Sequence, residues 1–571
     1  MPVLLLHSLR HALARLGQTW RAAPIRRVIQ TASLLLFLVL LLYVCWPYGS
    51  ADYAQTMRTK ERIPAELFLL LDPLLVFSTA LAGKSWVPAL VWAGVLFALS
   101  LFVPRGFCGY LCPLGTVIDL FDWGVGRRCE RAHLTRRGGW VHLKYYLLTG
   151  TLVAAVGGVL VSGFVAAIPV VTRGLQCILG PLQIGALKGW YLVPSFNAGH
   201  WLSIALFLAV LSLGLLQPRF WCRCVCPTGA VFSIANVFRL RERKVTDACV
   251  DCGKCVEVCP FDAIQADFTT RTTDCTLCET CGGVCPTKAI QYVGRWQDDS
   301  LKPPSKEPLW GEVAKSRRAF LASAAGGLAL AAGIPRLSPS KQGRMDWFVR
   351  PPGSVPEREF LQLCIRCSVC FQACPNNVLQ PVGIDQGLEA LWTPQVVARW
   401  SGCEPSCNNC GQVCPTGAIR ALPIEEKRAA RMGLAIVNEH TCLPHAQREA
   451  CQLCVDECKA AGYDAIEFQR VGTQVDADGA PVEGSGYLAP IVLADKCVGC
   501  GLCETRCFRI NARHKRLLAD TAIRIVAGPG NEDRLFQGSY RTARETGHPD
   551  KPAAGAPAGA TNDAYLPDFL K

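Results

Sequence analysis

The sequence predicts a multidomain membrane protein, in which an α-helical bundle carries small, cysteine-rich α+β domains on both sides of the membrane. Long apolar runs fill the first 220 residues, and most of the 32 cysteines fall in short-spaced repeated motifs. Half of the 571 residues are apolar and 18% are charged, which excludes a mainly disordered chain. The net charge of +14 lies largely beside apolar runs, where it orients membrane spans rather than binding nucleic acid.

Four apolar runs reach or approach the length that crosses about 30 Å of hydrocarbon. Clusters of arginine and lysine precede the first and third runs and follow the second and fourth, so they share one side. The N-terminus and the segment after residue 217 are therefore predicted to face the cytoplasm. The four runs cover residues 28–47, 86–103, 145–170 and 200–216.

A further apolar run, residues 66–83, contains Asp72 followed by Pro73. A full crossing here would separate the positive clusters, so we expect an interfacial or re-entrant helix near the outer face. Asp72 is either a functional acid at membrane depth or the N-cap of a helix that starts at Pro73. Both interpretations stay open.

One motif, PR-x-[FW]-C-x3-C-P-x-G, occurs at residues 104–115 and again at 218–229, each time directly after an apolar run. The repeat predicts a duplicated helix pair whose cysteines converge near a pseudo-twofold axis. Four thiolates suffice for a further iron–sulfur cluster or another metal. Two redox thiol pairs and buried structural cysteines are the alternatives. The four residues are Cys108, Cys112, Cys222 and Cys226.

Residues 246–295 contain the bacterial ferredoxin motif C-x2-C-x2-C-x3-C-P twice. Three closely spaced thiolates bind one cubane, and the fourth, before proline, ligates the other cluster. Zinc sites instead use two CxxC pairs, and disulfides are rare in a reducing cytoplasm. The sequence therefore predicts one [4Fe–4S] site from Cys249, Cys252, Cys255 and Cys285, and a second from Cys275, Cys278, Cys281 and Cys259.

After a linker at 296–315, the segment 316–336 starts with Arg317 and Arg318 and continues as a small, apolar run. It resembles a twin-arginine export signal placed inside the chain. The alternative is an ordinary short membrane helix. In both cases residue 315 lies inside and residue 337 outside, and we expect the segment to remain as a fifth span.

The predicted periplasmic half, residues 337–545, carries four more cysteine motifs, and the tail 546–571 is expected to be flexible. A disulfide framework is the alternative to four clusters, but the repeated triple-plus-one spacing argues against it. The spacing leaves open whether the first motif exchanges its fourth cysteine with the second or with the fourth. The motifs are Cys364, Cys367, Cys370 and Cys374; Cys403, Cys407, Cys410 and Cys414; Cys442, Cys451, Cys454 and Cys458; and Cys497, Cys500, Cys503 and Cys507.

Residues 1–295, with a membrane domain at 1–245, resemble NapH and MauN, membrane ferredoxin-type proteins with four spans, two CxxxCP motifs and a double cubane. Residues 316–515 resemble NapG and MauM, which have a twin-arginine start and four cubane motifs. The chain thus resembles a NapH–NapG fusion, and its CxxxCP motifs are shared with NosR and CcoG. The resemblance implies a quinol dehydrogenase that oxidises menaquinol or ubiquinol and passes electrons to a periplasmic redox enzyme or cytochrome c.

Quinol oxidation needs a proton acceptor beside a one-electron relay. Asp72 and His200 are candidates near the outer face, and Asp119, His133 and His142 near the inner face. No nucleotide-binding or nucleophile–base motif is seen. Three other functions stay open: a maturation reductase for a periplasmic metalloenzyme, a relay outward from a cytosolic ferredoxin-like donor, and CcoG-like metal handling. The cofactors expected are six [4Fe–4S] clusters and a quinone, with a seventh metal centre at the CxxxCP motifs as an open alternative.

Overall fold

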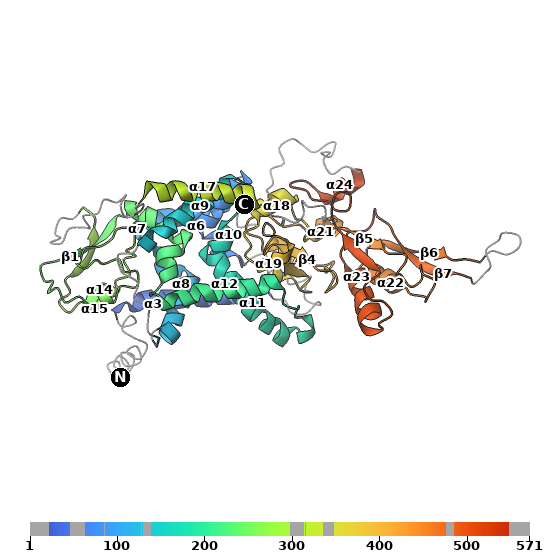
Figure 1. The fold of residues 1–571 in the computed structure, drawn as a ribbon, viewed down its shortest axis with the longest axis horizontal. Coiled ribbons are helices and arrows are strands. Elements are labelled where there is room, and N and C mark those ends of the chain that lie inside the picture. Colours follow the sequence, from blue (N-terminus) through green and yellow to red (C-terminus); the bar gives the residue numbers. More distant parts are fainter. Residues whose placement is uncertain are drawn as a thin grey trace.

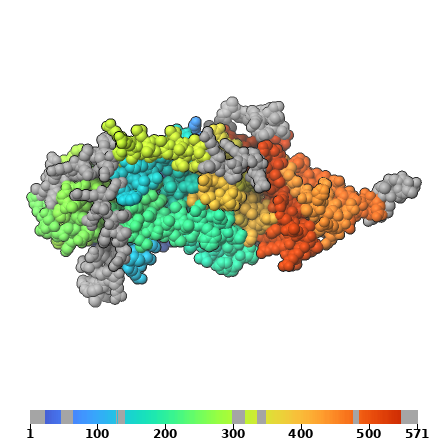
Figure 2. Space-filling model, in the orientation of Figure 1, coloured from blue at the N-terminus to red at the C-terminus, as the bar shows by residue number. Residues whose placement is uncertain are grey.

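The computed structural model describes residues 22–45, 63–84, 86–126, 128–129, 139–296, 313, 316–334, 348–474 and 485–546. His133, the tail beyond 546 and nearly all of the predicted linker lie outside these residues. The molecule is elongated: helices form its middle, the β1–β2 ferredoxin-type segment lies at one end, and the C-terminal half forms the other (Figure 1). Figure 2 shows the same order, with the C-terminal half tapering away from the bundle.

Three helices in the described part of the chain are long and apolar enough to cross a membrane, which supports membrane association. They are α3 (Pro24–Tyr43), α11 (Ala167–Leu187) and the Ala198–Leu215 segment, which begins with α12 (Ala198–Ser212). Pro24 occupies the first turn of α3, where its missing N–H costs no hydrogen bond. Asn197 caps α12 by accepting from the backbone N–H of His200.

Two of the four predicted spans differ in the structure. Residues 86–103 form α7 (Ala89–Phe102), whose 14 residues extend only about 21 Å at 1.5 Å per residue. Residues 145–170 are not one span, because α9 (Leu143–Val156) ends at Gly157 and α11 begins only at Ala167. Gly158, with φ of +85°, lies in the connection between them. The prediction of a single span is wrong here because two consecutive glycines interrupt an otherwise apolar run.

The segment after residue 62 forms two short helices, α5 (Leu67–Leu70) and α6 (Pro73–Gly83). α6 packs among α7, α9 and α13 (Pro227–Ala235), with most of its residues buried. The hydroxyl of its Ser78 lies 2.6 Å from that of Ser162 in α10 (Ser162–Val165). α6 therefore packs against several helices of the bundle, while Phe77 and Leu81 stay exposed. Its interfacial or re-entrant placement stays a prediction.

The two CxxxCP copies fold alike, as the duplication predicts. Each forms a π-helical turn, η2 (Phe107–Leu111) or η7 (Trp221–Val225), and then a short helix, α8 (Pro113–Phe121) or α13. In both copies the last cysteine is the N-cap of the short helix and proline is its first residue, an arrangement that suits proline's fixed φ.

The helix α17 (Arg317–Gly333), predicted as the fifth span, lies along α9 (Figure 1). Its 17 residues are capped by Ser316, whose side chain accepts from the backbone N–H of Ala319. Small residues bring the two backbones together: a Cβ added to Gly327 would lie 2.5 Å from the carbonyl oxygen of Gly150. Such close packing is typical of helices that associate in membranes.

Both ends of the molecule are built from short helices and two-stranded antiparallel sheets, in agreement with the α+β prediction. Loops and short helices between these strands carry the cysteine motifs, including α14 (Lys254–Glu257), α15 (Thr280–Val284), α19 (Val369–Ala373), α22 (Leu453–Ala460) and α23 (Leu502–Cys507). The sheets pair β1 (Arg241–Val245) with β2 (Ile290–Gly294), β3 (Leu379–Pro381) with β4 (Pro394–Val396), β5 (Leu434–Val437) with β8 (Ile523–Val526), and β6 (Ile466–Val471) with β7 (Tyr487–Val492).

Candidate iron–sulfur sites

The eight cysteines of residues 246–295 lie in two pockets. Arg243 of β1 lines both pockets, and its Nε atom is buried without a hydrogen-bond partner among the described residues. The structure brings together the two sets that the motif spacing predicts. Site I is lined by Cys249, Cys252, Cys255 and Cys285, and site II by Cys259, Cys275, Cys278 and Cys281.

The sixteen C-terminal cysteines form four further sets. The first motif exchanges its fourth cysteine with the second, and the third with the fourth, which settles the alternative that the spacing leaves open. Site III holds Cys364, Cys367, Cys370 and Cys414; site IV holds Cys374, Cys403, Cys407 and Cys410; site V holds Cys458, Cys497, Cys500 and Cys503; and site VI holds Cys442, Cys451, Cys454 and Cys507.

Sets of four cysteines are the ligands that a [4Fe–4S] cluster requires, and without iron, burial keeps several of their thiols protonated. Burial and the neighbouring thiols of site II raise the pKa of Cys259 to about 12, and burial likewise raises the pKa of Cys407 and Cys454 to about 12. Such thiols become thiolates when iron ligates them. Among the described residues, no three His, Cys, Asp or Glu side chains are placed to hold a single metal ion. When bound, the clusters would store and release single electrons.

Backbone amides reach the sulfur of several of the exchanged cysteines. The N–H of Ala263 donates to Cys259 Sγ at 3.3 Å, and that of Ala465 donates to Cys458 Sγ at 3.3 Å. Cys414 receives the same kind of bond from Ile419. Hydrogen bonds to ligand sulfurs stabilise the thiolate and tune the reduction potential of a bound cluster.

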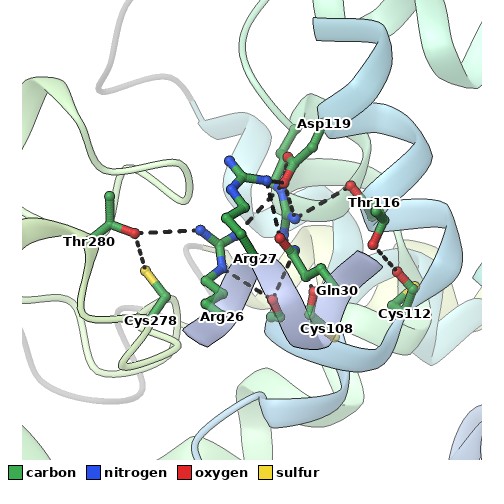
Figure 3. A network of polar contacts seen from close by, with 12 residues as sticks. Arg26, Arg27, Gln30, Cys108, Cys112, Thr116, Asp119, Cys278 and Thr280 are labelled. Atoms are coloured by element: carbon green, nitrogen blue, oxygen red, sulfur yellow. Dashed lines mark hydrogen bonds and ion pairs between the residues drawn. The ribbon is translucent and has the colours of Figure 1, made fainter. Parts of the chain in front are cut away.

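Site II lies against the bundle at the start of α3. Arg26 of α3 donates to the carbonyl oxygen of Gly109 at 3.2 Å and to Thr280 Oγ1 at 3.5 Å. The Thr280 hydroxyl lies 3.4 Å from Cys278 Sγ, so one chain of polar contacts joins η2, α3 and site II (Figure 3). In the sequence Arg26 is one of the positive charges before the first apolar run, and no motif marks it for this contact.

Site III lies against the opposite part of the bundle. The buried Arg173 of α11 donates to the carbonyl oxygen of Arg366 at 2.9 Å and stacks on Trp392 at 3.7 Å. Arg366 in turn donates to the carbonyl oxygen of Leu160 at 3.0 Å. Because Arg366 directly precedes Cys367, these bonds hold a ligand loop of site III on the membrane helices. No sequence motif marks Arg173 for this role.

The two candidate proton acceptors do not share a site. Asp72 caps α6, accepting from the backbone N–H of Leu74 at 3.1 Å and from the hydroxyl of Thr228 at 3.1 Å. Thr228 follows Cys226 by two residues, so Asp72 lies beside the CxxxCP segments, which the charge pattern predicts to face the cytoplasm, and not apart from them. The N-cap role is the one that the structure shows.

His200 lies at the other end of the bundle, against the C-terminal half. Its Nδ1 contacts the side chain of Asn197 at 2.8 Å, and the neighbouring Gly199 carbonyl accepts from Trp392 Nε1 at 2.9 Å. Of the inner-face candidates, Asp119 is held by Arg219 at 2.6 Å and by Arg27 at 2.6 Å. His142 Nδ1 lies 3.3 Å from the carbonyl oxygen of Val313.

Candidate membrane helices flanked by ferredoxin-type cysteine sets define a membrane-associated, ferredoxin-type iron–sulfur protein of electron transfer. A family model described as a 4Fe-4S binding domain matches residues 74–129 and 199–246, which contain the two CxxxCP copies. A second model with the same description matches residues 243–265.

The chain is 33% identical to the methylamine utilization ferredoxin-type protein MauM of Paracoccus denitrificans, over 38% of this chain and 89% of MauM. It is 36% identical to the ferredoxin-type protein NapG of Escherichia coli K12, over 34% of this chain and 80% of NapG. The chain therefore belongs to the ferredoxin-type family that includes MauM and NapG. It is also 32% identical to MauN of Paracoccus denitrificans, over 34% of this chain and 61% of MauN. No solved structure matches it.

Proposed function

We propose that this protein is a quinol dehydrogenase that takes electrons from a membrane quinol and delivers them to a redox partner at its C-terminal end. The observation that supports this most strongly is the placement of sites I and II at one end of the helical bundle and of sites III to VI at the other (Figure 1). A protein that only stores electrons has no need for two such sets held by membrane helices.

The chain joins a NapH-like half to a NapG-like half in this proposal. The partial likeness to MauN supports the first half, and the likeness to NapG and MauM supports the second. The positive clusters orient sites I and II toward the cytoplasm and sites III to VI toward the periplasm. α17 links the halves and stays in the membrane beside α9. The partner is then a periplasmic redox enzyme or a cytochrome c.

Asp72 and His200 remain the candidate proton acceptors for quinol. Asp72 can be tested cleanly because asparagine is as good an N-cap as aspartate but takes up no proton at neutral pH. We expect D72N to slow quinol oxidation at least tenfold while leaving the iron content unchanged. D495N, the same change at an exposed acid of the C-terminal half, is the control. Normal turnover of D72N would remove Asp72 from the mechanism.

The function itself is tested by mixing the anaerobic, detergent-purified protein with a reduced menaquinol analogue while cluster absorbance and EPR spectra are followed. Reduction of clusters on the timescale of turnover supports the proposal. Reduction by a cytosolic ferredoxin or flavodoxin, with no reduction by quinol, would show that electrons enter from a cytosolic donor. Slow reduction that depends on the apo form of a periplasmic metalloenzyme would point to a maturation role instead.

A further inference from the structure

The two CxxxCP copies interlock around four cysteines that belong to none of the six sites. Arg105 of the first copy donates to the carbonyl oxygen of Cys222 in the second, at 3.3 Å. Arg219, at the same motif position in the second copy, donates to the carbonyl oxygen of Cys108 in the first, at 3.4 Å. Both arginines have positive φ, +49° and +53°. These two reciprocal hydrogen bonds hold the two copies together.

The same four cysteines form one set. The thiols of Cys112 and Cys226 each interact electrostatically with those of Cys108 and Cys222, and Cys226 also interacts with Cys112. Cys222 and Cys108 interact in the same way. These interactions run across the copies as well as within them, and Phe107 of the first copy stacks on Phe232 of the second at 5.5 Å. The four thiols therefore lie in one neighbourhood, which we call the CxxxCP site.

Helix N-termini face this site. Cys112 and Cys226 are the N-caps of α8 and α13, and the N–H of Gly229 donates to Cys226 Sγ at 3.4 Å. The bond has the form seen at Cys259 and Cys458. Proline starts the helix, and glycine leaves room for the other chain segments, because a Cβ at Gly229 would lie 3.1 Å from the carbonyl oxygen of Cys222 and 3.3 Å from the Arg105 guanidinium. A helix N-terminus favours a thiolate over a thiol.

Buried positive charge surrounds the site as well. Arg105 and Arg219 are 0% and 1% exposed, yet each has only one carboxylate group as an ion-pair partner among the described residues, Asp274 and Asp119 respectively. The Nε atom of Arg105 is buried without a hydrogen-bond partner in the described part of the chain. Both guanidinium groups interact electrostatically with the Cys108 thiol, so an anionic group bound by the four cysteines would lie beside their positive charge.

The CxxxCP site also lies between site II and site III. The guanidinium groups of Arg105 and Arg219 both lie over the ring of Phe261, at 5.3 and 4.7 Å, and Phe261 follows Cys259 of site II by two residues. In the other direction, Cys112 and Cys226 share one buried apolar core with Cys367 of site III. Packed protein therefore connects the CxxxCP site to both neighbours.

We propose that Cys108, Cys112, Cys222 and Cys226 together bind one iron–sulfur cluster, shared by both copies, that connects site II with site III. Its presence follows from the geometry of the four cysteines, whereas its role as a connection rests on the proposed function. That role is a transfer of single electrons, from the reduced cluster of one neighbouring site to the oxidised cluster of the other. No bond or proton is exchanged.

Iron analysis of the anaerobic full-length protein tests the proposal. Seven cubanes need about 28 irons per chain and six need about 24. We expect about 28 in the wild type, about 24 in C108S/C112S/C222S/C226S, and about 28 in the control C45S/C129S, which changes two cysteines outside the motifs. A wild type with about 24 irons, unchanged in the fourfold variant, would overturn the proposal, as would copper bound at these cysteines.

Single variants provide a second test that does not depend on the folding of the fourfold variant. C112S and C226S lie in different copies, so a shared cluster predicts that both alter the same EPR signal and leave the other six unchanged. Loss of two different signals, or of none, would contradict a shared site. If iron and EPR agree with a shared cluster but quinol reduces nothing, the proposed function fails while the CxxxCP cluster stands.

Discussion

The backbone N–H of Cys403 donates to the carbonyl oxygen of Cys500 at 2.7 Å. Cys403 belongs to site IV and Cys500 to site V, so this bond joins the two cysteine-exchanging pairs of the C-terminal half. Sites III and IV share a pair of motifs, as do sites V and VI. The four sites therefore follow one another from the bundle, beside α19, to the region of α22 (Figure 1). Site VI ends the series, and we expect the redox partner to bind near it.

The exchange of fourth cysteines predicts how double variants combine. Because Cys364 and Cys414 share site III, C364S/C414S should lose about four irons, one cluster. C374S/C414S removes one ligand from each of sites III and IV and should lose about eight. Iron analysis of the two purified variants makes the comparison. Equal losses in the two variants would contradict the assigned exchange.

Gly163 fixes the contact between the membrane helices and site III. A Cβ at this position would lie 2.5 Å from the carbonyl oxygen of Ile365, a backbone atom that cannot move aside easily. We expect G163A to slow electron passage from sites I and II to sites III–VI at least tenfold with unchanged iron, because it displaces the ligand loop. Freeze-quench EPR after reduction measures the rate.

The control for that change is G94A. Gly94 of α7 has nothing within 4 Å of an added Cβ, so this substitution adds the same methyl group without a collision. A wild-type rate in G163A, or an equal slowing in G94A, would show that the contact at Gly163 does not govern the transfer.

A buried ion-pair network ties the last described segment to the start of the C-terminal half. Glu357 of α18 (Glu357–Leu363) binds Arg350 at 2.5 Å and Arg534 at 2.5 Å. Glu357 is only 26% exposed, and E357Q leaves the buried Arg350 without a carboxylate partner among the described residues, while Arg534 keeps Glu532 at 2.6 Å. The substitution should cost about 2 kcal/mol of unfolding free energy at pH 7. Thermal unfolding of the anaerobic holoprotein measures the loss, with E359Q on the same helix as the control.

The same network sets a pH dependence. Burial alone would raise the pKa of Glu357, but Arg350 and Arg534 hold it below its ordinary value. A carboxylate with a lowered pKa contributes its stability above the pKa of the unfolded chain, about 4.3, and loses it as the pH falls below that value. The difference between wild type and E357Q should be constant from pH 8 to pH 5.5 and shrink only at lower pH. A difference that shrinks between pH 8 and pH 6 would refute this assignment.

The packing of α17 against α9 predicts that the internal signal is not removed. A Cβ on Gly157 would lie 2.5 Å from that of Ala331, close to the end of α17, so the helix is held along its length. The mature protein should therefore remain one chain of 62.0 kDa in the membrane fraction. Intact-mass spectrometry checks this. Two fragments separated after α17 would show that the signal is cleaved.

Much of the site chemistry follows from sequence because cluster motifs are local. The short spacing of the cysteines within a motif determines which thiols can reach one cubane. The cysteine sets of sites I and II, in residues 246–295, could therefore be predicted. The partner of Cys374 was not, because the exchange depends on which motifs pack together. The same limit applies to Arg173 and Arg366, whose bonds join segments nearly 200 residues apart.

The membrane part shows where hydropathy fails. Apolar composition does not distinguish one long span from two helices joined by a turn. Within residues 145–170, only Gly157 and Gly158 indicate that the first helix ends. The contact of Asp72 with Thr228 was not predictable either, because charge patterns describe loops and not the packing of a short helix within a bundle. The duplicated motif, in contrast, predicted that Cys108 and Cys222 would approach, since repeated sequences fold alike.

The most direct test of the account is electron transfer across a membrane. The purified protein is reconstituted into sealed vesicles with dithionite trapped inside and a membrane-impermeant electron acceptor outside. We expect the acceptor to be reduced at a rate proportional to the protein content, and at least tenfold more slowly with C108S/C112S/C222S/C226S. No reduction above protein-free vesicles by a wild type with its full iron content would contradict it.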